Sequence, residues 1–566
     1  MKKLLLAGLL LSPFYGLFGQ QLDYARTINQ IGTEYFVKSV YDHSDQLVVY
    51  GARAIVGGPG GGAGPSNAWL QKYDTNGSLI WTLGTNYTQN GSEIQPMDIS
   101  IDSEDNVYIL ASLSAQSITL GGVTYTPPSH GGSNMIYAKI SSIGVVQWIK
   151  GFGQAHFSSN TCIGSSIFVT PDDQLLLTGG YYRGLIIGND TLAGIGNANV
   201  SNMPVPFGFY AKLDSNGTPI WAKRFSNLVT GEYNSFSGIS SSAVDDDGNL
   251  FFLMGLDSAV VMGNDTISSS NWMAVIKTDP SGNFIRAVIP QAGPTHADEI
   301  ALDYCGNLLL LGRFFDSIQV ENTTLNTLGN WDIFVTKFDH DLDLLWMKQF
   351  YSTGGDRAGG IACNNRNDIF FNFDFWGEIN YDGPYSPTPL GNTDGILFKL
   401  DEDGNTVWHK KTTGSGSITV ESISVSPSGK VGMAARYQGQ ENFDGTIINT
   451  TPTNLPDICS VSYTDTTLAA LPANCEGNLG LTDLINQESM LIYPNPTRET
   501  ITIAVHGNAQ KAFVSITDLS GRVMHTARVL EKTPVISVAN FPEGIYILRM
   551  QLENGETWNG KFIVKH

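Results

Sequence analysis

The sequence is poor in positive charge. Its 566 residues include 32 Lys and Arg against 53 Asp and Glu, a formal net charge of −21. Nucleic-acid phosphates and anionic lipid both require clustered Lys and Arg, so the composition argues against nucleic acid and charged membrane surfaces as partners. No apolar run after the first twenty residues is long enough to predict a transmembrane segment.

Cysteine is scarce and odd in number, with Cys162, Cys305, Cys363, Cys459 and Cys475. In an oxidising compartment at least one of them stays unpaired. Cys459 and Cys475 are the candidate disulfide, because a loop of about 15 residues closed by a bond is stabilised by roughly 3 kcal/mol. A Cys305–Cys363 bridge is the alternative. The repeat places no His beside a Cys, so we expect no catalytic thiol.

The first residues have the pattern of a secretory signal peptide. Two lysines precede the apolar run Leu4 to Leu11, and the small residue Gly19 follows it. The run is too short to span a bilayer. We expect residues 1–19 to be removed during export, and no Cys follows the run to accept a lipid.

The chain contains a repeat with a period near 60 residues. The copies end in K-x-D-x-x-G-x-x-x-W, complete in three of six and varied at one position in the others, and successive copies are 67, 73, 65, 60 and 62 residues apart. One degenerate copy has Arg286 at the Trp position. The Trp residues of the repeat are Trp81, Trp148, Trp221, Trp346 and Trp408. Strand-like repeats of this length are typical of propellers and β-solenoids, in which we expect these aromatic side chains to pack between neighbouring units.

Each repeat predicts one four-stranded antiparallel sheet. A strand, a turn rich in Asp, Asn, Ser and Gly, and a second strand come first, as in Ala301 to Gly312. A variable polar stretch and the K-to-W strand pair follow. No helical periodicity separates them, which is typical of a propeller blade.

The two ends of the repeat region complement each other. Seven first strands can be counted, but the seventh repeat has no closing strand of its own, whereas Leu22 to Glu34 matches a closing strand with Tyr24 at the Trp position. Pairing of the two ends would leave no exposed sheet edge. We therefore predict an all-β chain with a seven-bladed β-propeller over residues 20–467, closed by its terminal strands. A linker over residues 468–488 and a small β-sandwich over residues 489–566 follow.

The last residues carry four ordered motifs. They comprise Tyr493, Pro494, Asn495 and Pro496; Asp518, Gly521 and Arg522; Gly544 and Tyr546; and Lys561 and Lys565. In this order they resemble the type A C-terminal sorting domain of the type IX secretion system. The resemblance implies recognition by that secretion machinery, transport across the outer membrane and removal of the tail. The protein would then be released or attached to a surface lipopolysaccharide. More weakly, the repeats resemble the secreted β-propeller-repeat proteins that carry such tails.

Two acidic turns contain the weak candidates for metal ligands. They are Asp245, Asp247 and Asn249 in one turn, and Asp401, Asp403 and Asn405 in the other. Clustered oxygen atoms suit a weak Ca²⁺ site, but neither turn has the bidentate Glu of an EF-hand loop. A solvated hairpin turn is the favoured interpretation, and a weak, blade-stabilising Ca²⁺ site is the alternative. No catalytic or cofactor-binding residue can be named.

The favoured function is that of an exported binding, adhesion or structural module, with a glycan or protein ligand on one face. Its variable loops include residues 54–67, 121–134 and 194–206, and loops on a rigid scaffold often carry recognition. The alternative is a secreted carbohydrate-active enzyme, a hydrolase or lyase. Carboxylates are abundant, but no spacing selects a catalytic pair.

Overall fold

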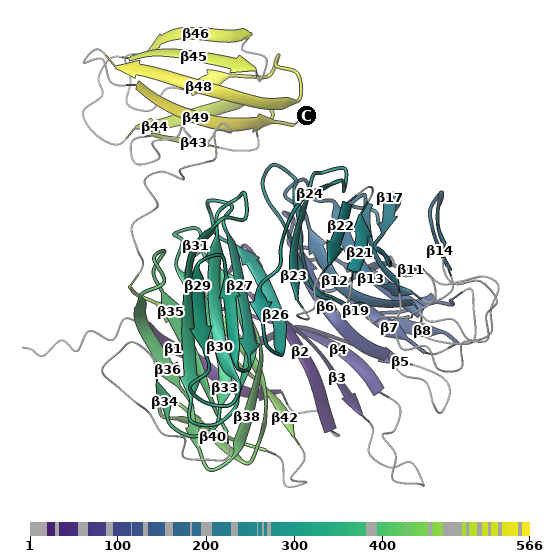
Figure 1. The fold of residues 1–566 in the computed structure, drawn as a ribbon. Helices are drawn as coiled ribbons and strands as arrows, with labels where there is room; N and C mark the ends of the chain where they lie inside the picture. Colours follow the sequence, from purple (N-terminus) through teal and green to yellow (C-terminus); the bar gives the residue numbers. More distant parts are fainter. Residues whose placement is uncertain are drawn as a thin grey trace, which may run out of the picture. The chain divides into compact units, whose positions relative to one another are not determined.

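The computed structural model is all-β, as the sequence predicts (Figure 1). It describes residues 20–565 except 29–32, 55–65, 87–93, 115, 128–133, 153–161, 182–183, 194–206, 228–235, 257–258, 263–264, 269–272, 381–392, 427, 451–455, 468–489, 494–496, 506–511, 519–521, 530–534 and 553–556. The described residues contain no helix that could cross a membrane. The chain forms two compact units, residues 1–472 and 473–566.

Seven successive sheets of the first unit each contain four antiparallel strands paired in order. Sheet 1 has β2 (Thr33–Tyr41), β3 (Leu47–Ala54), β4 (Ser66–Tyr73) and β5 (Leu79–Asn86). Sheet 2 has β6 (Ile94–Ile101), β7 (Val107–Leu113), β10 (Asn134–Ile140) and β11 (Val146–Phe152). Sheet 3 has β12 (Cys162–Val169), β13 (Leu175–Tyr181), β16 (Phe207–Leu213) and β17 (Pro219–Arg224).

The next three sheets repeat this order. Sheet 4 has β19 (Phe236–Val244), β20 (Leu250–Leu256), β23 (Ala274–Thr278) and β24 (Phe284–Val288). Sheet 5 has β26 (Thr295–Leu302), β27 (Leu308–Phe314), β30 (Asp332–Phe338) and β31 (Leu344–Ser352). Sheet 6 has β32 (Asp356–Cys363), β33 (Ile369–Phe375), β35 (Asp394–Leu400) and β36 (Thr406–Lys411).

Sheet 7 combines the two ends of the repeat region. It has β38 (Ser417–Val425), β39 (Lys430–Gln438), β42 (Asp457–Asp465) and, as its last strand, β1 (Gln20–Ile28). In the pairing of β1 with β42, Gln20 lies opposite Asp465 and Ile28 lies opposite Ile458. The N-terminal strand therefore occupies the closing position that the match of residues 22–34 predicts.

Short additional strands lie in the connections between the main strands of these sheets. They are β8 (Ile118–Leu120), β9 (Val123–Tyr125), β14 (Gly184–Ile187), β15 (Asp190–Ala193), β18 (Ser226–Asn227), β21 (Ala259–Met262), β22 (Asp265–Ser268), β25 (Gln291–Ala292), β28 (Ser317–Val320), β29 (Thr323–Asn326), β34 (Ile379–Asn380), β37 (Thr413–Gly414), β40 (Gln440–Phe443) and β41 (Thr446–Asn449).

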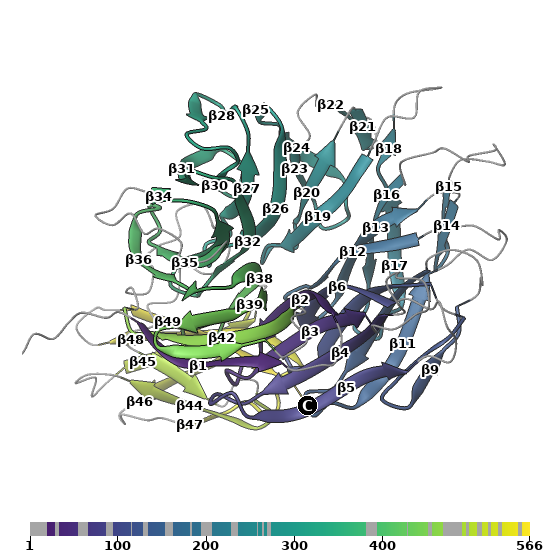
Figure 2. The same cartoon turned by 90° about the horizontal axis from the view of Figure 1, so that it is seen from below.

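Apolar clusters join each sheet to the next. The second strands are buried along their whole length, as in β7, β13 and β33, because both faces of each sheet are covered and a continuous apolar run is then favoured. Between sheets 7 and 1 lies a cluster that includes Ile28, Tyr41, Trp69 and Ile458. Figure 2 shows the first strands of the seven sheets around a common centre.

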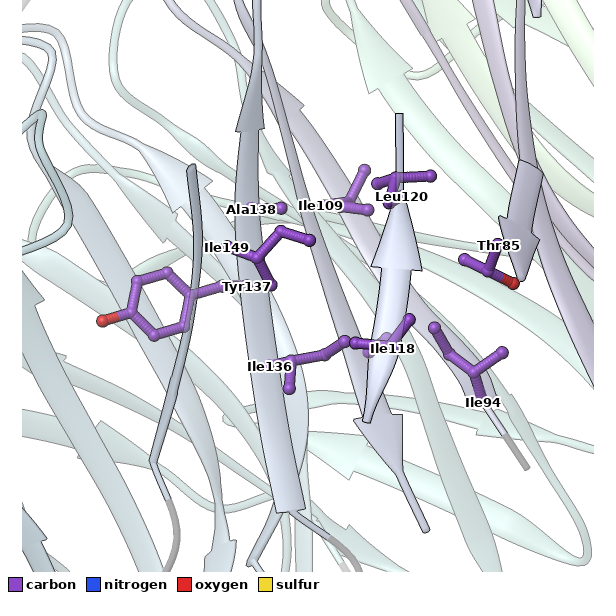
Figure 3. Close-up of a pocket in the computed structure, with 10 residues that line it drawn as sticks. Thr85, Ile94, Ile109, Ile118, Leu120, Ile136, Tyr137, Ala138 and Ile149 are labelled. Atoms are coloured by element: carbon purple, nitrogen blue, oxygen red, sulfur yellow. The ribbon is translucent and has the colours of Figure 1, made fainter. Parts of the chain in front are cut away.

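One small apolar cavity lies in the core between sheets 1 and 2 (Figure 3). Ile109, Ile118, Leu120 and Ile136 contribute to its lining, and its volume is about 10 Å³. A space of this size holds at most one water, and an apolar lining offers that water no partners. The cavity is a packing gap and offers no room for a ligand.

In five closing strands the aromatic residue lies on a glycine turn of the next sheet. A Cβ atom added to Gly144 would lie 2.8 Å from the ring of Trp81, and the positive φ of 83° favours glycine there as well. The same contact joins Trp148 to Gly217, Trp221 to Gly282 and Trp346 to Gly404. Tyr24 of β1 lies in this way on Gly77 of sheet 1, where an added Cβ would be 2.7 Å from its ring. The contact from sheet 7 to sheet 1 is therefore of the same kind as the others.

Two closing strands make polar contacts at this position. In the degenerate repeat, Arg286 replaces Trp and donates to the carbonyl of Asp341 at 2.7 Å and to the carboxylate of Asp343 at 2.7 Å. Trp408 donates from Nε1 to Asp465 Oδ1 of sheet 7 at 3.2 Å. These two closing strands therefore also contact the next sheet at this position, but through hydrogen bonds in addition to or in place of aromatic packing.

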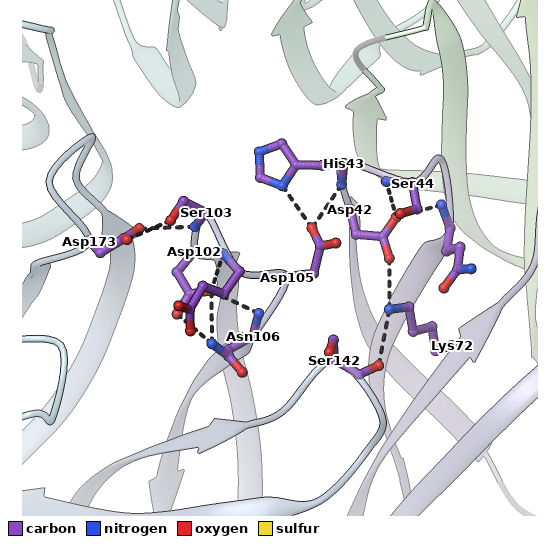
Figure 4. Close-up of polar contacts among 12 residues, drawn as sticks. Asp42, His43, Ser44, Lys72, Asp102, Ser103, Asp105, Asn106, Ser142 and Asp173 are labelled. Atoms are coloured by element: carbon purple, nitrogen blue, oxygen red, sulfur yellow. Dashed lines mark hydrogen bonds and ion pairs between the residues drawn. The ribbon is translucent and has the colours of Figure 1, made fainter. Parts of the chain in front are cut away.

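The Lys of the K-x-D motif adds a polar link at the same junctions (Figure 4). Lys72 Nζ lies 2.7 Å from Asp42 Oδ2 of its own sheet and donates to the Ser142 carbonyl of the next sheet at 3.1 Å. Lys337 likewise contacts Asp303 Oδ2 at 2.9 Å and the Glu402 carbonyl at 3.2 Å. These side chains are buried, and removing one member of a buried ion pair typically costs 3–5 kcal/mol.

The turns between first and second strands also join neighbouring sheets. Asp105 has a left-handed φ of 62° and accepts the backbone N–H of His43 at 2.9 Å (Figure 4). Asp173 accepts from Ser103 N at 2.9 Å in the same way. Asp and Asn tolerate this conformation, so the turn residue both shapes its hairpin and holds the preceding sheet.

The second unit contains two sheets around one apolar core. The first has β43 (Met490–Tyr493), β44 (Thr500–Val505) and β47 (Val535–Ser537). The other has β46 (Val523–Val529), β45 (Ala512–Asp518), β48 (Gly544–Leu552) and β49 (Thr557–Val564). Ile501, Ile503, Val514 and Leu548 are among the buried residues that both sheets contribute.

We predict that Tyr24→Ala destabilises the first unit nearly as much as Trp81→Ala, because both aromatic side chains lie on a glycine turn of the next sheet. Truncation of a packed aromatic costs about 3 kcal/mol or more. Thermal unfolding of both variants, with Tyr24→Trp as the conservative control, measures the effect. An Ala variant of Tyr24 that melts with the parent would show that β1 contributes nothing to this junction.

Candidate functional site

Charge at one repeated position distinguishes sheets 5 to 7 from the others. The strand pairings identify equivalent residues near the end of each second strand: Ala52, Ser112, Gly180, Gly255, Arg313, Asp374 and Arg436. The first four are small, and the last three are charged. Contacts that the architecture needs recur in every sheet, so residues that break the repeat are the better candidates for function.

Bulges in the first strands bring further charges to the same region. The pairings of β26 and β38 each skip one residue, Asp298 and Glu421 respectively. All seven first strands have a bulge at this place, which leaves one residue out of the ladder and re-aims its side chain. Only in β26 and β38 is the skipped residue charged. We call His296, Asp298, Arg313, Arg357, Asp374, Glu421 and Arg436 the charged arc.

Sheets 6 and 7 contribute a network of paired charges to the charged arc. Arg357 Nε lies 3.3 Å from Asp374 Oδ1, and Arg357 Nη2 lies 3.8 Å from Glu421 Oε1. Arg436 Nη2 lies 2.5 Å from the same Glu421 oxygen. The other oxygen, Glu421 Oε2, accepts the backbone N–H of Val37 at 3.0 Å. Burial raises the pKa of Asp374 to about 6, although the neighbouring Arg357 lowers it.

Next to the charged arc, a second ion pair connects sheets 1 and 5. Lys38 Nζ lies 3.1 Å from Glu299 Oε1, although the two residues are 261 positions apart. Glu299 Oε2 also accepts the N–H of Ile361 at 3.3 Å. A Cβ atom on Gly360 would lie 2.8 Å from this oxygen, so glycine makes room for the carboxylate. These bonds give both oxygens of Glu299 a structural partner.

The sheet 5 part of the charged arc is less completely bonded. Asp298 Oδ2 and Arg313 Nε are buried without a hydrogen-bond partner among the described residues. Burial raises the pKa of Asp298 to about 7, opposed by the positive charges of Arg313 and Arg357. The ring of Trp331 lies 5.2 Å from that of His296, and the Arg313 guanidinium lies 5.7 Å from the Trp331 ring. Burial, followed by the charge of Arg313, lowers the pKa of His296.

The acidic turns suggested as calcium ligands use their carboxylates within the turn. Asp245 accepts from Asn249 N at 2.7 Å and from Asn249 Nδ2 at 2.8 Å. Asp401 accepts from Asp403 N at 3.1 Å and Asn405 N at 2.7 Å. Asp247 is exposed in its turn. In the part of the chain that the structure describes, no three His, Cys, Asp or Glu side chains are grouped as metal ligands.

The cysteines lie apart from the charged arc. Cys459 is buried in β42 as a thiol, in the core between sheets 6 and 7. The predicted Cys459–Cys475 disulfide is therefore wrong. Cys363 is a free thiol whose pKa burial raises well above its usual value. The alternative Cys305–Cys363 bridge is therefore wrong.

The C-terminal motifs are only partly within the described residues. Tyr546 is buried, and its hydroxyl donates to the Pro542 carbonyl at 2.6 Å. Gly544 has a φ of 155° at the start of β48. Arg522, Lys561 and Lys565 are exposed. Pro494, Asn495, Pro496 and Gly521, together with the side chains of Tyr493 and Asp518, fall outside the described part.

The sequence pattern did not identify the charged arc, since its members are separated by up to 140 positions, from His296 to Arg436. The sequence nevertheless contains a pattern that could have identified the charged arc. Aligning the seven second strands would have shown Arg313, Asp374 and Arg436 where the other copies have Ala, Ser or Gly. Trp331 would have been found in the same way.

The comparisons with known proteins concern the tail most directly. Residues 491–565 match the family model of the secretion system C-terminal sorting domain. The sorting-domain prediction is confirmed, and the protein is exported by the type IX secretion machinery to the cell surface or beyond it. A search of curated proteins found no match.

Several solved structures are similar at low identity. PorZ of Porphyromonas gingivalis, described as a surface component of the type IX secretion system, is 12% identical over 93% of this chain and 91% of its own, with a TM-score of 0.14. A DUF4221 family member from Bacteroides vulgatus is 11% identical over 67% and 99%, with a TM-score of 0.30. NanB sialidase of Streptococcus pneumoniae is 10% identical over 79% and 70%, with a TM-score of 0.36. Such weak likenesses support no conclusion about activity.

We predict that Asp298→Asn raises the melting temperature more at about pH 8 than at about pH 5. The pKa of Asp298 is raised to about 7 in the folded protein, so its stabilising contribution is fully present below the unfolded pKa of about 4 and is lost as the pH rises through about 7. Melting curves across this range, with the exposed Asp341→Asn as control, test the prediction. Equal pH profiles for Asp298→Asn and the parent would contradict it.

We also predict that deletion of residues 489–566 leaves the repeat unit in the periplasm, because the sorting domain is its export signal. Fusing the same segment to another periplasmic protein should carry that protein outside. Cell fractionation and mass spectrometry of C-terminal peptides measure both outcomes. Normal surface abundance of the tail-less protein would contradict the assignment.

Proposed function

We propose that this protein is an exported seven-bladed β-propeller that acts as a binding module outside the cell. Residues 20–467 form the propeller, closed by β1 in sheet 7, and residues 489–566 form a β-sandwich that delivers it. Residues 1–19 act as a removable signal peptide, and residues 468–488 act as a linker. After removal of the tail, the protein is either released or anchored to lipopolysaccharide.

Closure of the propeller is supported by contacts between sheets 7 and 1 that are equivalent to those between consecutive sheets elsewhere. Ser39 N donates to Ser422 Oγ at 3.0 Å. Ile167 N donates in the same direction to Asp98 Oδ2, from sheet 3 to sheet 2, at 3.0 Å. Together with the contact of Tyr24 with Gly77, this repetition favours a cyclic arrangement over an open solenoid, whose end sheets would lack such partners.

The observation that carries the binding function is the charged arc. The other sheets meet their structural needs with small residues at the same positions, so the architecture does not require charge there. Two large side chains beside the arc are also exposed, Phe315 by 41% and Trp376 by 43%. Each directly follows a second strand, β27 or β33, and therefore lies at the same end of its sheet as Arg313 or Asp374. Exposed aromatics beside charged groups are typical of recognition surfaces.

A secreted hydrolase or lyase acting on carbohydrate is the second candidate. The raised pKa values of Asp298, about 7, and Asp374, about 6, would suit a general acid near neutral pH. Asp374 is already paired with Arg357, which leaves one carboxyl where glycoside hydrolysis generally uses two. We therefore favour binding over catalysis.

We predict that replacing Phe315 and Trp376 together by Ser lowers ligand binding at least tenfold without lowering stability. The test is a screen of the mature chain, starting at Gln20, against glycan arrays and extracted cell-surface proteins, followed by titration of each hit. Tyr304→Ser is the matched control, because Tyr304 is 52% exposed but lies in the β26–β27 turn, at the opposite end of the same strands.

The outcomes separate the alternatives. Binding that the double variant loses and Tyr304→Ser keeps supports a module that binds through the charged-arc face. Binding lost only in Tyr304→Ser would place the ligand at the other end of the propeller and contradict the proposal. Turnover of a bound glycan would favour the second candidate function, a carbohydrate-active enzyme, over a binding module.

A further inference from the structure

Some groups of the charged arc have all their hydrogen-bonding capacity used by protein partners, and others do not. Glu421 has partners on both carboxylate oxygens, and Arg357 and Arg436 are paired with carboxylates. In contrast, Asp298 Oδ2 and Arg313 Nε are buried and have no hydrogen-bond partner among the described residues. Leaving a buried polar atom unpaired costs about 1–3 kcal/mol, more for a charged group. Sheet 5 therefore retains hydrogen-bonding capacity that the fold itself does not use.

An aromatic surface lies beside these two groups. Trp331 is half-buried, and its ring centroid lies 5.2 Å from that of His296 and 6.0 Å from that of the exposed Phe315. The Trp331 carbonyl accepts the N–H of Asp356 at 2.9 Å, which ties the residue to sheet 6. The indole thus packs on residues of sheet 5, while the backbone of Trp331 is bonded to sheet 6.

This aromatic residue is specific to sheet 5. Trp331 lies seven positions before Phe338, the third-strand residue that pairs with the first residue of β27. In sheets 1, 6 and 7 the same count from the equivalent residues gives Ser66, Thr393 and Pro456. None is aromatic, so packing between sheets does not demand an indole there. Within the charged arc, the two groups without hydrogen-bond partners and the additional aromatic therefore belong to the same sheet.

We infer that Trp331, His296, Arg313 and Asp298, with Phe315 at their edge, form a binding site for a neutral sugar. The inference rests on the proposed function and names its ligand class. A pyranose has an apolar C–H face that packs on an aromatic ring and hydroxyl groups that both donate and accept. Trp331 supplies the ring, Asp298 accepts from a hydroxyl, and Arg313 donates to one.

The charge balance favours a neutral ligand over an anionic one. Burial raises the pKa of Asp298 to about 7, so at neutral pH this partly ionised carboxyl offsets part of the positive charge of the nearby Arg313. The lowered pKa of His296 keeps the imidazole uncharged at neutral pH. Glu299 and Lys38 face Asp298 from their own strands and neutralise each other at 3.1 Å, while Arg357 from β32 is paired with Asp374.

The buried oxygen of Asp298 can reach a ligand by a small movement. Asp298 as a whole is half-buried, and rotation about the Cβ–Cγ bond of an aspartate is soft and two-fold. A partial rotation turns the buried oxygen toward the surface, where a ligand hydroxyl can donate to it. Relief of that unpaired state adds to the affinity.

The test uses the full mature chain and titrates it with neutral oligosaccharides from mannan, dextran and galactan, alongside oligosaccharides that contain uronic acid. We expect one neutral series to bind, with an affinity that changes little between about 50 and 500 mM NaCl because no charge is neutralised. Trp331→Ala should weaken binding by at least tenfold, and Trp331→Phe should restore most of it. Asp298→Asn should weaken it by roughly tenfold to a hundredfold, the range for a lost hydrogen bond to a charged group.

Asp298→Asn keeps the inference falsifiable if Trp331→Ala fails to fold, because the isosteric change should not lower stability. Tyr304→Ser, at the other end of sheet 5, should bind as the parent does. Binding that weakens steeply with salt, or prefers uronic acid, would overturn the neutral-sugar assignment. Binding of a protein that is unaffected by Trp331→Phe and Asp298→Asn, with no glycan bound, would refute the sugar site while leaving the proposed binding module intact. The absence of any ligand would refute both.

Discussion

The contact between an aromatic ring and a glycine turn of the next sheet is the interaction on which the first unit depends. A sheet with both faces covered needs neighbours on each side, and a flat ring on a residue without a side chain brings two sheets together with little loss of volume. Trp81 on Gly144 and Tyr24 on Gly77 are two examples of this contact. The Lys of the same motif adds a buried ion pair within its own sheet and a hydrogen bond to the next. One short motif therefore provides both apolar packing and a satisfied charge.

Repetition of this junction leaves the other end of the sheets free to vary. The structural contacts of Lys72, Trp81 and Asp105 involve closing strands and hairpin turns. The second strands then run toward the opposite end, where Gly180 of sheet 3 and Arg313 of sheet 5 occupy equivalent positions. Sheet 5 keeps the junction contacts of Lys337 and Trp346 although Arg313 replaces a small residue there. A repeat scaffold can accordingly carry a site on a few of its units while all of them contribute stability.

The division into two compact units fits an export signal that folds separately from the repeat unit. The second unit has its own apolar core, built from residues such as Ile503 and Leu548. The packing of the first unit uses none of these residues. A transport signal that folds around its own core can be removed after export without opening the core of the protein it delivers.

The sequence by itself determined the features that depend on local pattern. Alternating strands, polar turns and the 60-residue period predicted the order of the sheets, and the likeness of residues 22–34 to a closing strand predicted the place of β1. The ordered tail motifs predicted the sorting domain. Only the tertiary structure decided which residues far apart in the sequence come into contact. The ion pair of Lys38 with Glu299 joins positions 261 apart, and a bulge of one residue decides where Asp298 points. Oxygen atoms that suggested calcium in the Asp245 turn bond instead to the N–H groups of that turn. Composition can show that a turn is acidic, but only the folded backbone decides which donors its carboxylates reach.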